Sequence, residues 1–205
     1  KHSHEYRRGY LCGLIRGDGH VGSYSYVRSG RSRGDVHRFR LALVDAEALD
    51  RCRRYLLDEG IVTTPFVFQA PQPNRKPITA LRTSSKAQVQ RNGILRIRQR
   101  RTVHRRIDAL LALLKGFLAG IFDAEGSSSQ GVFRISNTDP RVINEITESL
   151  EGFGFTFVLE VIPRANPITC VRLIGGLREL LRFFHTTDPA ITRKRTIEGR
   201  AVKNN

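Results

Sequence analysis

The chain has 205 residues, 40% of them hydrophobic, which is a globular composition and enough chain to bury a core. Lys and Arg number 35 against 19 Asp and Glu, so the formal net charge is +16 and the sequence pI is near 10.9. No apolar run approaches the roughly 18 residues of a membrane span, and the N-terminus lacks a signal-peptide pattern, so we expect an intracellular protein of a bacterial cytoplasm or an organelle rather than a secreted one.

The positive charge is mostly Arg, whose planar fork binds phosphates and guanine edges with two hydrogen bonds. Such a charge attracts polyanions, and nucleic acid is the commonest of them. Three cysteines form no CxxC pair, and the six histidines show no zinc-like spacing. We therefore expect buried free thiols at Cys12 and Cys52, and a metal ion, where one binds, held by oxygen ligands.

The predicted elements follow in chain order. The first half predicts a helix at 5–18, an alternating strand pattern in "HRFRLAL" (37–43), a helix at 46–59 between Asp45 and Gly60, strands near 63–70 and 77–83, and a polar segment at 85–92. Residues 93–106 form a basic connector. The second half predicts a helix at 107–125 followed by the matching strand pattern, a helix at about 140–151 capped by Asp139, strands at 156–163 and 167–174, and a helix at 176–185.

The second half repeats the first. With Asp18 set on Glu125 the offset is 107, and the glycines at 9, 13 and 17 fall on Gly116, Gly120 and Ala124. "FRLALVD" matches "FRISNTD" at an offset of 94, and "PITALR" matches "PITCVR" at 90. Four collinear matches, the last being "RRT" with "KRT" at 94, indicate a duplicated unit. The first copy is longer by a hairpin whose tip carries Arg28, Arg31 and Arg33.

Small residues recur every fourth position in both motif helices, which places them on one helical face. Glycine inside a helix costs roughly 0.5–1 kcal/mol relative to Ala, so three in register need a reason. Because small residues let two backbones approach closely, we expect the two faces to pack on each other across a pseudo-two-fold axis. Gly19 and Gly126 come directly after the helices, and we expect them in the left-handed conformation.

Each motif helix ends on a carboxylate, Asp18 in the first and Glu125 in the second. Anions are disfavoured at helix C-termini by roughly 0.3–1 kcal/mol, and two like charges near the axis add to that. A divalent cation between them would reverse both effects. The carbonyls of Gly17 and Ala124, unpaired within their helices, could add oxygen ligands. Oxygen ligation with room for water suits Mg²⁺. Taken singly, either carboxylate is better interpreted as an ordinary surface residue at a helix end. The symmetric pair on two small-residue faces in a strongly basic chain favours the metal site instead.

"LCGLIRGDG" (11–19) and "LAGIFDAEG" (118–126) resemble the two signature motifs of the LAGLIDADG homing endonucleases in their single-chain form. The first copy departs from the pattern at Arg16, where the family has an acid. The resemblance implies an α+β fold of two pseudo-symmetric αββαββα repeats, with motif helices packed at the two-fold axis and antiparallel sheets forming a DNA-binding saddle. The repeats are then 1–92 and 107–205, joined by the connector at 93–106.

The resemblance also implies an activity: recognition of a long pseudo-palindromic double-stranded DNA target and metal-dependent hydrolysis of one phosphodiester on each strand. Asp18 and Glu125 would be catalytic and metal-binding, with Gly17 and Ala124 as further ligands to Mg²⁺, or to Mn²⁺ or Ca²⁺. The implied assembly is a monomer that acts as a pseudo-dimer. Further catalytic residues by the family pattern are Lys194, its counterpart Arg100, and the water-positioning Asn137, whose equivalent Leu43 cannot do that work.

The DNA-binding residues are predicted from the polar faces and turns of the strands. In "HRFRLAL", Phe39, Leu41 and Leu43 point to one side, and Arg38, Arg40 and Ala42 to the other. The whole predicted set is Arg28, Arg38, Arg40, Arg75, Lys76, Arg134, Ser136 and Arg164.

Three other functions stay open at this point. One is a catalytically weak DNA-binding regulator of the same fold, although both acids are present. Another is an intron RNA maturase, which can coexist with nuclease activity. The third is the endonuclease part of an intein, although "VKNN" at the end lacks the pattern of a splicing C-terminus.

Overall fold

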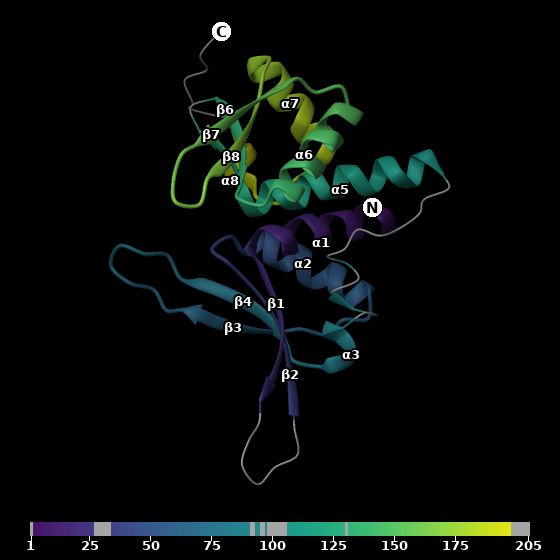
Figure 1. The fold of residues 1–205 in the computed structure, drawn as a ribbon, viewed down its shortest axis with the longest axis vertical. Helices are drawn as coiled ribbons and strands as arrows, with labels where there is room; N and C mark the ends of the chain where they lie inside the picture. The colour runs from purple at the N-terminus through teal and green to yellow at the C-terminus, as the bar shows by residue number, and fades with distance from the viewer. Residues whose placement is uncertain are drawn as a thin grey trace. The chain divides into compact units, whose positions relative to one another are not determined.

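The computed structural model describes residues 2–26, 34–90, 93–94, 97, 106–129 and 131–197 (Figure 1). Its first set of elements is α1 (His4–Asp18), β1 (Gly19–Tyr26), β2 (Gly34–Leu43), α2 (Ala46–Asp58), β3 (Thr64–Gln69), β4 (Ile78–Thr83) and α3 (Lys86–Val89). The second set is α5 (Ile107–Glu125), β5 (Gly126–Ser129), β6 (Val132–Asn137), α6 (Pro140–Gly152), β7 (Phe157–Ile162), β8 (Ile168–Leu173), α7 (Gly176–Thr187) and α8 (Thr192–Arg195). The predicted α+β class and the duplicated element order are both confirmed.

The chain divides into two compact units. One contains Lys1–Gly17 and His104–Asn205, and the other contains Asp18–Val103. Helix α1 therefore packs with the elements of the second repeat, almost to its last residue. Among the described residues no helix is both long enough and apolar enough to cross a membrane.

Each unit holds one four-stranded antiparallel sheet, ordered β1-β2-β4-β3 in one and β5-β6-β8-β7 in the other. The pairing repeats residue by residue. Leu41 lies across from Leu81 in the first sheet, and Ile135 lies across from Val171 in the second. Residue 135 is 94 positions after 41, and 171 is 90 positions after 81, which are the offsets read from the sequence. The duplication is confirmed in the registers of the strands.

The predicted alternation along β2 is confirmed by burial. Phe39, Leu41 and Leu43 are buried, whereas Arg38 and Arg40 are exposed. The buried side of this sheet is covered by α2, which presents an apolar face that includes Leu49, Cys52 and Leu56, and packs on β2 and β4. The arginines lie on the opposite side of β2, where the side chains of Arg38 and Arg40 are exposed.

The core of the other unit lies between its sheet and the helices α5, α6 and α7, which pack on the inner strands β6 and β8. Its centre is a group of phenylalanines. The rings of Phe122 and Phe133 are stacked with their centres 4.9 Å apart, and the ring of Phe183 meets that of Phe133 edge-on with centres 4.5 Å apart. Such ring pairs add about 0.5–1.5 kcal/mol beyond the area that they bury. The cluster anchors the last turn of α5, which carries the motif.

The helix ends agree in part with the predicted caps. Asp139 accepts a hydrogen bond from Arg141 N at 2.9 Å, with Pro140 in the first turn. Asp45 holds the N-cap position of α2, but its side chain makes no capping hydrogen bond. Gly60 has a φ of +75° just after α2, as expected for glycine at that place. In the polar segment at 85–92 the helix covers only Lys86–Val89.

Candidate active site

The small-residue faces of α1 and α5 contact each other directly, as predicted. A Cβ built on Gly13 would lie 2.6 Å from Ile121 N, and one on Gly120 would lie 2.9 Å from Leu14 N. Both distances are shorter than real Cβ contacts, and the atoms met are backbone. Gly9 and Gly116 are closed in by backbone in the same way. Figure 1 shows α1 and α5 running side by side. The two helices therefore pack backbone against backbone, which only glycine allows.

The carboxyl end of this helix pair brings Gly17 against Ala124 and Glu125. A Cβ on Gly17 would overlap Ala124 Cβ and lie 3.1 Å from Glu125 Cγ. Asp18 follows Gly17 in the chain and is the last residue of α1. Three of the four predicted metal-binding positions thus adjoin one another, and the fourth is the next residue along the chain. Among the described residues no group of three or more His, Cys, Asp and Glu could hold a metal ion.

The predicted left-handed conformation after both helices is wrong. Gly126 is extended, with φ −83° and ψ 151°, and begins β5. Gly19 begins β1 and pairs with Leu41, and it too has no positive φ. The chain passes from helix directly into strand. Glycine is needed at 126 for a different reason, because a Cβ there would lie 2.7 Å from Phe122 Cγ.

Lys194 lies at the C-terminus of α5, where three backbone carbonyls accept from its ammonium group. Nζ is 2.6 Å from Asp123 O, 3.2 Å from Phe122 O and 3.4 Å from Ala124 O. A cation is favoured at this end of a helix, where carbonyls lack intrahelical partners. The predicted basic catalytic residue is thus held beside two of the predicted metal positions. The longest of its three hydrogen bonds is the one to the Ala124 carbonyl, the predicted ligand.

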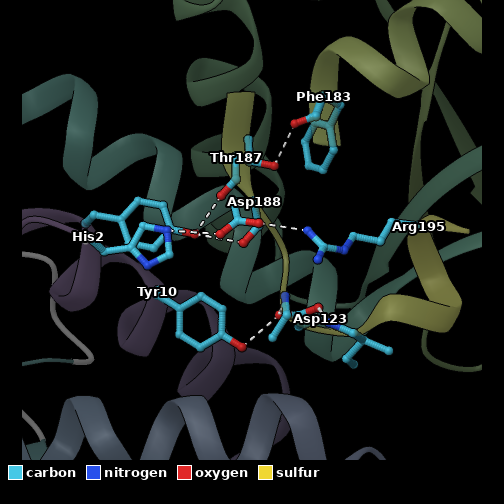
Figure 2. Close-up of polar contacts among 10 residues, drawn as sticks. His2, Tyr10, Asp123, Phe183, Thr187, Asp188 and Arg195 are labelled. Carbon is cyan, nitrogen blue, oxygen red and sulfur yellow. Dashed lines mark hydrogen bonds and ion pairs between the residues drawn. The ribbon is translucent and has the colours of Figure 1, made fainter. Parts of the chain in front are cut away.

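Asp123 connects α5 to the segment that carries Lys194 (Figure 2). The residue is only 1% exposed. Oδ2 accepts from the Tyr10 hydroxyl and from Ala190 N, both at 2.7 Å, and Oδ1 accepts from Ile191 N at 3.1 Å. Hydrogen bonds to a charged acceptor contribute about 1.5–3 kcal/mol each. The sequence analysis includes Asp123 in the second motif but predicts no role for it. The signal that could have indicated one is a charged residue within an apolar turn of the helix.

Asp188 forms a second polar junction just after α7 (Figure 2). It is in the left-handed conformation, with a φ of +52°, and its carboxylate accepts from His2 Nε2 at 3.0 Å and Arg195 Nη1 at 2.7 Å. The Tyr6 hydroxyl donates to Thr187 O at 2.6 Å. These contacts fasten His2, the first turn of α1 and the last residue of α8 to the end of α7.

Arg16 stands in the first motif where the second has Asp123, and it forms an ion pair instead. Its Nη1 lies 2.5 Å from Glu145 Oε1 on α6, and the two side chains are 13% and 26% exposed. Burial by itself lowers the pKa of Arg16, but the hydrogen bond to Glu145 and its charge raise the pKa, and the net shift is upward. Arginine in place of an acid at position 16 therefore changes local packing and charge. This agrees with its place in the chain, before the predicted metal-binding residues.

Asn137 lies at the end of β6, across from Thr169, just as Leu43 ends β2 across from Thr79. Asn137 Oδ1 accepts from Asp139 N at 2.8 Å, which orients the amide in the turn before α6. Leu43 is buried. The two equivalent positions therefore differ chemically, as the sequence predicts.

The predicted DNA-binding residues occupy the open faces and turns of the two sheets. Arg38 and Arg40 line an open groove of about 880 Å³ on the first sheet, beside Arg82. Arg134 lies in β6 of the second sheet with Ser136 two residues on, and both are partly buried. Arg75, Lys76 and Arg164 are exposed in the turns between β3 and β4 and between β7 and β8. Arg28, Arg31, Arg33 and Arg100 lie outside the described residues.

Two further residues of the first sheet were missed by sequence reasoning. The rings of Phe66 and Phe68 lie beneath the guanidinium groups of Arg82 and Arg40. The signal was "TPFVFQ", in which two aromatic residues alternate along a strand, so that both fall on one face.

Comparison with known proteins agrees with this architecture. Residues 112–187 match the family of LAGLIDADG-like domains, and no curated protein sequence matches the chain. The structure of I-DmoI in complex with DNA and Ca has a TM-score of 0.65 and 18% identity, covering 90% of each chain. The I-LtrWI LAGLIDADG homing endonuclease bound to target DNA has 0.62 and 14%, covering 94% of this chain and 87% of the other. The N-terminal LAGLIDADG domain of DUF199/WhiA has 0.59 and 16%, covering 96% and 85%.

At these identities the solved structures establish the fold alone, and the fold is shared with a domain that is not described as an endonuclease. The family match covers the second motif helix and most of its repeat. The first motif helix packs on it through glycines, and the first sheet repeats the register of the second. Residues 112–187 therefore match the family of LAGLIDADG-like domains, and the described residues have the two-repeat fold seen in the structures of I-DmoI and I-LtrWI.

Proposed function

We propose that the chain is a site-specific endonuclease that recognises a long pseudo-palindromic double-stranded DNA target and hydrolyses one phosphodiester on each strand with a divalent metal ion. The observation that carries this proposal is the helix pair. Two helices pack backbone to backbone through Gly13 and Gly120, and each ends on a carboxylate, Asp18 or Glu125. The two repeats would be residues 1–92 and 107–205, joined by a connector at 93–106. The biological role would be homing of a mobile intron or intein.

Asp18 and Glu125, with the carbonyls of Gly17 and Ala124, have the hard oxygen atoms that Mg²⁺ prefers, and Mn²⁺ or Ca²⁺ could take the same ligands. Structures of the similar I-DmoI with DNA contain Ca or Mn, or were obtained with Mg. A bound divalent cation would lower the pKa of the attacking water and stabilise charge on the leaving oxygen. In the reaction, water adds to phosphorus, one P–O ester bond breaks, and the proton of the water ends on the released hydroxyl.

The remaining residues act around this centre. Lys194, held at the end of α5 by Asp123 O and Phe122 O, would place positive charge beside the phosphate as negative charge builds on it. Arg100 would do the same in the first repeat. The Asn137 amide, with its oxygen fixed in the turn, keeps its N–H donors for a water molecule or phosphate, whereas Leu43 has none. The two strands would therefore be cut at unequal rates.

Binding would rest on the basic strand faces, from Arg28, Arg38, Arg40, Arg75, Lys76, Arg134, Ser136 and Arg164, and on the net charge of +16. A protein that binds through phosphate contacts loses affinity steeply with salt. We therefore expect tight but salt-sensitive binding to duplex DNA by a monomer. The two sheets differ in sequence, so the target is expected to be only approximately palindromic.

The test is selection of cut sites from a randomised duplex library in Mg²⁺, with Glu125→Gln compared to the unaltered protein. Glu148→Gln, on the exposed side of α6, is the matched control that removes a charge elsewhere. We expect one long asymmetric site to be cut by the unaltered protein and by Glu148→Gln, and not by Glu125→Gln. If neither the unaltered protein nor Glu125→Gln cuts while both retain the same sequences, the carboxylates have no catalytic role and the chain is a binding module.

A further inference from the structure

Two arginines of the first sheet rest on two phenylalanine rings. The guanidinium carbon of Arg40 in β2 is 4.5 Å from the ring centre of Phe68, and that of Arg82 in β4 is 4.7 Å from the ring centre of Phe66. The rings themselves meet edge to face, with centres 6.4 Å apart. We call these four residues the arginine platform.

The platform places two like charges side by side. Arg40 and Arg82 are directly opposite each other across β2 and β4, an arrangement that is destabilising in an antiparallel pair. Neither forms an ion pair with the described residues. Their side chains also line the open groove with His20, Arg38 and Thr64, and none of the described residues that line it is a carboxylate. A sheet face that keeps unfavourable charge in this way is suited to an anionic or acceptor-rich partner.

The second repeat carries the same pair without the platform. Arg134 and Arg172 are opposite each other in β6 and β8, in the register of Arg40 and Arg82. Glu160 stands at the position of Phe66, and Arg172 Nε donates to Glu160 Oε1 at 2.6 Å. In this repeat a carboxylate neutralises the guanidinium and takes one of its donors. In the first repeat the partner is a ring, which contacts the flat face and leaves the N–H edge available.

We propose that Arg40 and Arg82 read guanine in the half-site contacted by the first sheet, and that this half-site is specified more strictly than the other. The inference rests on the proposed function and deepens it. Guanine presents O6 and N7 at the major-groove edge, and the arginine fork matches this pair with two parallel hydrogen bonds. A guanidinium held flat on a ring is already ordered, so less rotamer entropy is lost on binding. Both arginines lie on the two inner strands, and a two-stranded ribbon fits the major groove.

The test is selection of bound duplexes from a randomised library without divalent metal, so that binding is scored apart from cleavage. Arg82→Lys and Arg40→Lys keep the charge but lose the fork, and Arg172→Lys is the matched control. We expect each of the first two to weaken binding to the selected site roughly 5- to 150-fold and to relax one guanine position, since one bidentate contact carries this much discrimination. Arg172→Lys should leave every base preference in place. Phe66→Leu should weaken binding roughly 2- to 5-fold.

The possible results distinguish guanine contacts from phosphate contacts. If Arg82→Lys and Arg40→Lys lose affinity uniformly for all sequences, the two arginines contact phosphates and not bases, and the proposal is overturned. Equal relaxation by Arg172→Lys, or a selected site with no guanine at the sensitive positions, would overturn it as well. A failure of the unaltered protein to enrich any sequence would instead refute the proposed function. Circular dichroism and the urea midpoint of each variant show whether it is folded, so that a misfolded variant is not read as a lost contact.

Discussion

Replacing Gly120 with alanine tests the backbone contact between α1 and α5. An alanine Cβ at this position would lie 2.9 Å from both Leu14 N and Tyr10 C, with no flexible side chain to move aside. Gly152, in the last turn of α6, has nothing within 4 Å of a built Cβ. The same substitution at the two sites therefore differs only in what the new methyl group meets, and we expect effects of opposite sign.

The magnitudes follow from two terms. Alanine in a helix gains roughly 0.5–1 kcal/mol over glycine at either site. At Gly120 the clash with backbone forces the helices apart, and overpacking of this kind costs about 1–3 kcal/mol or more. Because the atoms met are backbone, the upper end applies, so we expect a net loss of about 2 kcal/mol for Gly120→Ala and a small gain for Gly152→Ala. For a chain of this size these correspond to a Tm lower by about 4–8 °C and one higher by about 1–3 °C.

The assay is urea unfolding followed by far-UV circular dichroism, with thermal melts as a second measurement. A lower midpoint for Gly120→Ala with an unchanged m-value confirms a loss of native stability. If Gly120→Ala instead unfolds at or above the midpoint of the unaltered protein, as Gly152→Ala should, the helices are not in backbone contact. Close backbone contact would then not be the reason for glycine at position 120.

Three further perturbations have defined outcomes. Asp123→Asn should lower stability by about 2–4 kcal/mol in urea unfolding, because one amide oxygen replaces two carboxylate oxygens that face three donors. Glu145→Gln should cost about 1–2 kcal/mol by leaving Arg16 without its charged partner in a largely buried site. The three cysteines, Cys12, Cys52 and Cys170, are free and buried, and burial raises the pKa of the Cys52 thiol. Ellman's reagent should therefore label no thiol of the folded protein at pH 7 or pH 9, and should label three thiols after unfolding.

Each of these can fail in a recognisable way. An Asp123→Asn protein as stable as the original would mean that the buried carboxylate is not the centre of the contacts with Tyr10 and the segment at 190–191. If the loss of stability in Glu145→Gln depends on salt concentration, the ion pair between Arg16 and Glu145 is exposed and screened instead of buried. Labelling of even one cysteine at pH 7 under native conditions would show that its part of the core opens to solvent.

The duplication and its alignment could be predicted to the residue from the sequence. A sheet tolerates no slip, because a shift by one residue turns every side chain to the other face. Both copies therefore keep the same pairings, such as Leu41 with Leu81 and Ile135 with Val171. For this reason the offsets between matching residues of the two repeats can be read from the sequence. The bounds of α5 were also predicted as observed, at 107–125, because a long apolar helix with a repeated small face has a strong local pattern.

Only the tertiary structure decided how the ends of the motif helices are built. Gly126 was expected to be left-handed and is extended, and glycine is required there because a Cβ would collide with both the ring and the carbonyl oxygen of Phe122. The donors that meet Asp123, and the carbonyls that meet Lys194, come from residues 67 to 113 positions away in the chain. Local periodicity reports which side of an element is buried, but it holds no information about which distant group lies opposite. That pairing is set when the helices and sheets pack, and so the contacts of Asp123 and Lys194 and the arginine platform are visible only in the folded chain.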